Sequence, residues 1–120
     1  MHNILLVDPN DRPFDAKAIE RVFQSEPGFS DVRYNEPGGA YIEAEYVLGD
    51  YRTIARLSDN CDTISLSGTS DAALQAALIL QKNLHTPLRM VDTDYSFDLI
   101  LSSLSSIEEL QAAIDAARSS

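Results

Sequence analysis

The feature that most constrains this chain is a run of alternating apolar and polar residues that begins near residue 40. Ile42, Ala44, Tyr46 and Leu48 occupy every second position, with more polar residues between them. A period of two is typical of a strand with one buried and one solvated face. The pair Gly49-Asp50 then predicts a tight turn, so we expect the next segment to return antiparallel.

The alternation continues on both sides of this hairpin. Segment 51–57 alternates, a turn is expected at Ser58-Asp59-Asn60, and segment 63–67 alternates again. Before the hairpin, Val32 and Tyr34 alternate with polar neighbours, and Pro37-Gly38-Gly39 predicts a further turn. We therefore expect a meander of three or four antiparallel strands over residues 30–67.

Helical spacing surrounds the meander. The short apolar run 4–7 predicts a buried strand, after which Asp8 is expected to cap the turn at Pro9. A helix is then expected to begin near Asp11 and Pro13 and to end at Pro27-Gly28. A second helix is expected from a cap at Thr69 or Ser70 to about Leu84, and a third over residues 106–118. Their apolar stripes predict that each helix buries one face.

Between the last two helices, segment 88–91 predicts a strand, and alternation resumes from Tyr95 to Leu101. We expect Tyr95 and Phe97 to be buried and the nearby acids to face solvent. A break at 92–94 that splits this segment into two strands is an open alternative.

These elements indicate one α+β domain over residues 1–120. We expect a largely antiparallel sheet of about five to six strands and about three helices packed mainly on one face. A doubly wound parallel sheet would require alternation of strand and helix throughout, and the meander excludes it.

Charge limits the class of partner. The 120 residues include 19 Asp and Glu against 9 Lys and Arg, which gives a formal net charge of −10. Such a chain is a poor match for nucleic acids or anionic membranes, so neither is expected as a partner. With a single cysteine, Cys61, and no signal-peptide or membrane-helix pattern, we expect a cytoplasmic protein.

No motif predicts catalysis, and we expect no enzyme, no catalytic residue, no cofactor and no metal ligand. His2, His85 and Cys61 form no recognised local pattern for nucleophilic chemistry. The closest approach to a metal loop is Asp92, Asp94 and Asp98, which lacks the glycine and glutamate of a calcium-binding EF-hand loop. These three acids are expected on a solvated strand face, where they are candidates for binding a partner.

The remaining candidates lie on the meander. Glu43 and Glu45 share one strand face with Tyr41, and a tyrosine beside carboxylates is well suited to a protein interface. The alternative is that Arg52 and Arg56 pair with the two glutamates across the hairpin. We leave both open. The predicted partner-binding residues are therefore Tyr41, Glu43, Glu45, Asp92, Asp94 and Asp98.

The closing segments 94–99 and 105–110, in a small acidic chain without catalytic motifs, resemble the final strand and helix of bacterial immunity proteins. These proteins neutralise a cognate toxin of a contact-dependent, Rhs or type VI secretion system. The resemblance implies a stoichiometric inhibitor that binds a toxin. The charge agrees, because an acidic inhibitor is steered toward a basic toxin.

Two other functional classes remain open. A cytoplasmic adaptor or regulatory interaction domain, including a homo-oligomer, would have the same acidity, because charge also favours solubility. A small-ligand-binding domain or an enzyme would require a deep pocket with convergent polar groups. A tight, salt-sensitive complex with a basic protein would favour the immunity function over both.

Overall fold

The structure is a computed structural model that describes residues 3–36 and 40–119. Within these residues it contains a seven-stranded antiparallel sheet and three α-helices. The strands are β1 (Asn3–Val7), β2 (Phe29–Glu36), β3 (Ala40–Leu48), β4 (Tyr51–Ser58), β5 (Ile64–Ser67), β6 (Arg89–Asp92) and β7 (Asp98–Ile100). The helices are α1 (Ala16–Ser25), α2 (Asp71–Asn83) and α3 (Ile107–Ser119), and a short 3-10 turn, η1, spans Leu101–Ser103.

The predicted meander is confirmed. Strands β2, β3, β4 and β5 are consecutive neighbours, and Leu48 pairs with Tyr51 around the two-residue turn. Gly49 adopts the left-handed conformation that such a turn requires (φ +59°). The predicted turn at Pro37-Gly38-Gly39 lies outside the described residues.

The N-terminal strand lies inside the sheet. The strand order is β2-β3-β4-β5-β1-β6-β7, so β1 pairs with β5 on one side and with β6 on the other. Ile4 and Leu6 are fully buried, as the apolar run predicts. The segment after α2 forms two strands, because a turn in which Tyr95 N–H donates to Asp92 O separates β6 from β7. The sheet therefore exceeds the expected five to six strands.

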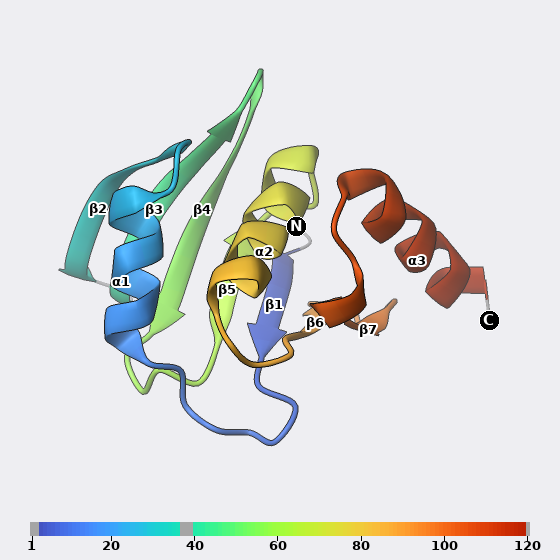
Figure 1. Cartoon of the computed structure of the whole chain (residues 1–120), viewed down its shortest axis with the longest axis horizontal. Helices are drawn as coiled ribbons and strands as arrows, with labels where there is room; N and C mark the ends of the chain where they lie inside the picture. Colours follow the sequence, from blue (N-terminus) through green and yellow to red (C-terminus); the bar gives the residue numbers. More distant parts are fainter. Residues whose placement is uncertain (1–2, 37–39, 120) are drawn as a thin grey trace.

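All three helices cover the same face of the sheet, which confirms the predicted α+β arrangement (Figure 1). Helix α1 contacts β2, α2 contacts β3, β4 and β5, and α3 contacts β7. The core between the layers is apolar, with Phe23, Leu57, Leu66 and Leu80 at 1% exposure or less. The opposite face has no helix over it among the described residues.

The predicted start of α1 is wrong. The helix begins at Ala16, and Asp15 caps it by accepting a hydrogen bond from Lys17 N–H at 3.0 Å. Asp11, the expected cap, lies in a turn with φ +58°. The segment is held out of the helix because Phe14 N–H donates to Cys61 O in the β4–β5 loop at 2.7 Å.

Candidate functional site

The helix-free face of the sheet, which we call the open face, carries three of the six residues that were predicted to bind a partner. The register connects one residue from every strand into a row across this face. In order, the row contains Arg33, Glu43, Arg56, Ser65, Leu5, Val91 and Asp98. Five strand spacings of about 4.8 Å separate Glu43 from Asp98, a span of about 24 Å.

Ion pairs lie at both ends of this row. Glu43 pairs with Arg56 at 3.4 Å on the β3–β4 side. On the β6–β7 side, Asp98 accepts from Arg89 Nε at 2.9 Å. The pairing with Arg89 holds the pKa of Asp98 below its ordinary value. Between these ends, Leu5 and Ser65 are half-buried and carry no charge.

The cross-strand pairing left open by the sequence is therefore present. Besides Glu43–Arg56, Glu45 lies 3.6 Å from Arg52. The side chains of Glu43 and Glu45 are only 15% and 27% exposed, while their arginine partners are more than half exposed. A partner meeting this face would contact the guanidinium groups as well as the carboxylates.

Tyr41 and Asp94 occupy exposed positions. Tyr41 is 40% exposed and lies where the register between β3 and β4 shifts, between Ala40 and Ile42. Asp94 is exposed in the turn between β6 and β7. The structure thus brings Glu43, Glu45 and Asp98 onto one face, with Tyr41 at a register shift and Asp94 in a turn.

The predicted position of Asp92 differs from its position in the structure. The expectation that it faces solvent is wrong, because its residue is only 1% exposed. Asp92 pairs with Ile4, and both lie on the face that the helices cover. Burial acts to raise the pKa of Asp92, but hydrogen bonds from the Ser96 hydroxyl and backbone N–H outweigh it, so the pKa lies below the ordinary value.

Of the two neighbouring aromatic residues that were predicted to be buried, only one is. Phe97 is buried as predicted, under the guanidinium of Arg118, which lies 5.5 Å from the ring centroid. Tyr95 was expected to be buried and is instead 73% exposed. Its φ of +53° belongs to the turn, which interrupts the alternation from which its burial was predicted.

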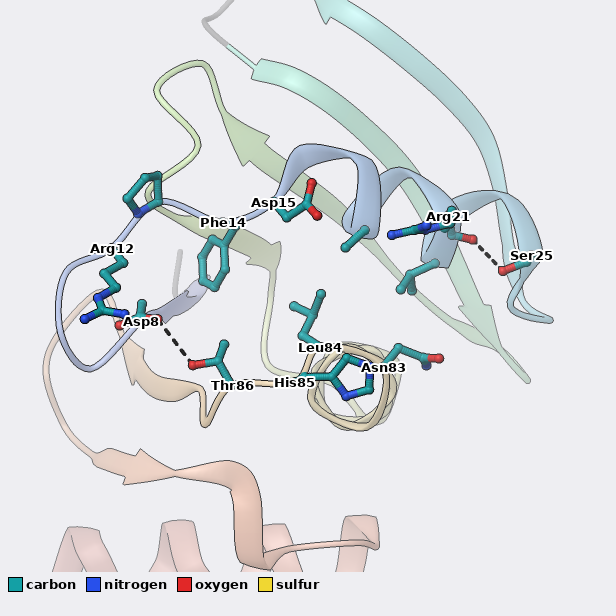
Figure 2. A pocket seen from close by; sticks show the side chains of 13 residues that line it. Asp8, Arg12, Phe14, Asp15, Arg21, Ser25, Asn83, Leu84, His85 and Thr86 are labelled. Atoms are coloured by element: carbon teal, nitrogen blue, oxygen red, sulfur yellow. Dashed lines mark hydrogen bonds between the residues drawn. The ribbon is translucent and has the colours of Figure 1, made fainter.

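A second feature, which the sequence did not indicate, is a cleft of about 760 Å³ between α1 and the end of α2 (Figure 2). The segment between β1 and α1 forms one wall, and the turn after α2 forms another. The residues that line this cleft are Asp8, Arg12, Pro13, Phe14, Asp15, Ala18, Arg21, Val22, Ser25, Asn83, Leu84, His85 and Thr86.

The two carboxylates of the cleft are held by its own walls. Asp8 accepts from Asn10 N–H at 2.7 Å, as predicted for a residue that caps the turn at Pro9, and also from the Thr86 hydroxyl at 3.3 Å. Asp15 is the cap of α1. Residues 8–25 and 83–86 are distant in sequence, and no local pattern indicated that Arg12, Arg21 and His85 would line one cleft.

Within the described residues, no group of three or more His, Cys, Asp and Glu side chains is arranged to hold a metal ion. No helix among them is long and apolar enough to span a bilayer. No protein-family model, curated protein or solved structure matches the chain.

Proposed function

We propose that this protein is a non-catalytic protein-binding domain, an immunity protein that neutralises a cognate bacterial toxin by stoichiometric binding in the cytoplasm. The observation that carries the proposal is the open face, which joins three of the six predicted partner-binding residues, Glu43, Glu45 and Asp98. Its centre is uncharged and its ends carry ion pairs, a distribution that matches the apolar core and polar rim of protein interfaces.

The dimensions of the face also favour a protein partner. The span of about 24 Å between Glu43 and Asp98 suits a standard interface, which buries about 800 Å² on each partner. The net charge of −10 would steer a basic toxin toward the protein before contact. The paired arginines would then restrict which partner fits, since unmatched charges at a buried interface are costly.

The test begins with the isolation of this protein, together with any bound partner, from the native cells. The partner is identified by mass and is then produced in pure form. We expect a 1:1 complex that weakens as salt rises, and a partner that is toxic unless this protein is expressed with it. A partner without toxicity would favour the adaptor alternative. Absence of a stoichiometric complex would contradict the proposal.

Charge reversal locates the surface. We expect Glu43→Lys with Glu45→Lys to weaken the complex at least about tenfold, because each substitution places a cation beside an existing arginine and toward a basic partner. Glu108→Lys with Asp115→Lys is the matched control, since it makes the same charge change at exposed positions of α3. Equal weakening by both pairs would show that overall charge, and not the open face, governs binding.

A further inference from the structure

The arginines of this acidic chain differ in whether they form ion pairs. Five of the seven form ion pairs with carboxylates, and only Arg12 and Arg21 form none with any described residue. Both unpaired arginines line the cleft between α1 and α2. With 19 acids to 9 bases in the chain, a shortage of carboxylates does not explain why these two lack partners.

Neither carboxylate that lines the cleft forms an ion pair with these two arginines. Asp8 accepts hydrogen bonds from Asn10 and Thr86, and Asp15 accepts one from Lys17 N–H. The strongest donors left in the cleft are the guanidinium groups of Arg12 and Arg21. A guanidinium presents five N–H donors in a planar fork that matches a carboxylate or a phosphate.

The rest of the cleft is suited to an apolar group. Figure 2 shows Arg12 and Arg21 toward opposite ends, with the Phe14 ring between them and Leu84 on the facing wall. Phe14, Val22 and Leu84 expose only small parts of their side chains, which form the wall surface. A volume of about 760 Å³ lies within the range of sites that hold small organic molecules.

We propose that this cleft binds a small organic anion, a carboxylate or phosphate monoester attached to an apolar body. The anionic group is held by Arg12 or Arg21, and the apolar body packs against Phe14 and Leu84. The cleft is separate from the open face. Failure of this proposal would therefore leave the proposed function intact, and failure of the proposed function would leave this proposal intact.

The experiment titrates the whole protein with phenyl phosphate, phenylacetate and the neutral analogue benzyl alcohol, and follows backbone amide signals by NMR. We expect the two anions to shift amides that line the cleft, such as those of Ala18 and Leu84, and benzyl alcohol to bind at least about tenfold more weakly. The tighter anion identifies the preferred head group.

Two variants test the assignment. Arg12→Gln with Arg21→Gln is expected to weaken anion binding at least about tenfold. Arg52→Gln with Arg56→Gln, which removes the same charge from the open face, is expected to leave the binding unchanged. Ala18→Leu fills part of the cleft without changing its charge, and we expect it to weaken the binding of both anions.

The proposal is overturned if neither anion binds saturably, if benzyl alcohol binds as tightly, or if the shifted amides lie outside the cleft. It is also overturned if the control pair weakens binding as much as the cleft pair. Single substitutions of Arg12 and Arg21 then show which end of the cleft holds the anion.

Discussion

Gly28 shows how one residue fixes the junction between α1 and the sheet. Its φ is +95°, and an added Cβ would lie 2.6 Å from Cε1 of the buried Tyr46 ring. That ring also packs on Phe29, with centroids 4.7 Å apart. We expect Gly28→Ala to lower the free energy of unfolding by about 2–4 kcal/mol, from backbone strain and overpacking together. Urea denaturation measures the loss.

Gly49→Ala is the matched control. Gly49 also has a positive φ (+59°), but an added Cβ would meet nothing within 4 Å. We expect a loss of only about 1–2 kcal/mol, from the backbone alone. Equal losses at the two positions would contradict the steric explanation for Gly28.

The burial of Asp92 could not be predicted from the sequence. The residue is polar and lies next to a turn, and both features predict exposure. Its burial depends on Ser96 and on Arg118, which is 26 positions later in the chain and 4.0 Å from the carboxylate. Local spacing does not predict such a contact, so the sequence did not show that Asp92 lies on the opposite side of the sheet from Glu43, Glu45 and Asp98.

Gln81 joins the end of α2 to the segment that leads into β6. Its Nε2 donates to Thr86 O at 3.0 Å, and its Oε1 accepts from Leu88 N–H at 2.7 Å. Gln81→Leu keeps similar volume but leaves both backbone groups without this partner. We expect it to lower the free energy of unfolding by about 2 kcal/mol or more. We also expect faster amide hydrogen exchange in β6.

Gln75→Leu provides the comparison on the same helix. Gln75 is partly exposed and makes no side-chain hydrogen bond with the described residues. Its substitution is expected to change the free energy of unfolding by less than about 0.5 kcal/mol. If Gln75→Leu and Gln81→Leu cost the same, the two bonds of Gln81 do not hold the turn.

The elements differ in how far sequence could predict them. The meander was predictable because period-two alternation and the Gly49-Asp50 turn agree with each other. The start of α1 was not, because Asp11 and Pro13 are good start signals in isolation. What moves the start to Ala16 is the bond from Phe14 N–H to the β4–β5 loop, a contact between segments almost 50 residues apart. The cleft between α1 and α2 depends on the same kind of long-range contact.

The excess negative charge of the molecule lies away from the open face. Ion pairs engage Glu43, Glu45 and Asp98, so the paired charges on this face largely cancel. The unbalanced carboxylates lie instead in turns and on helices, as at Asp50, Asp59 and Glu108. In the proposed complex, the net charge would therefore act on the partner at long range, while the open face would provide short-range contacts.

Stability of the whole molecule should respond to acid through carboxylates whose pKa is lowered on folding. Hydrogen bonds from Ser96, which outweigh burial, do this for Asp92, and the ion pair with Arg89 does it for Asp98. An unfolded aspartate takes up a proton near pH 3.9, above the pKa of these folded carboxylates. Their stabilisation is therefore complete above that range and is lost as pH falls through the folded pKa values. We expect the free energy of unfolding to decline steeply below about pH 4.

Asp92→Asn tests this assignment within the intact molecule. The variant is expected to be less stable than the wild type at pH 7, because the charged acceptor for Ser96 is lost. The difference between the two free energies of unfolding, the gap, should narrow below about pH 4, where the unfolded wild-type chain takes up a proton at Asp92 more readily than the folded protein does. Urea denaturation between about pH 2.5 and pH 7 measures the gap, with Gly49→Ala as a variant that retains every carboxylate. For Gly49→Ala we expect the gap to stay constant with pH. A constant gap for Asp92→Asn as well would mean that the charge of Asp92 does not contribute to the acid sensitivity of the fold.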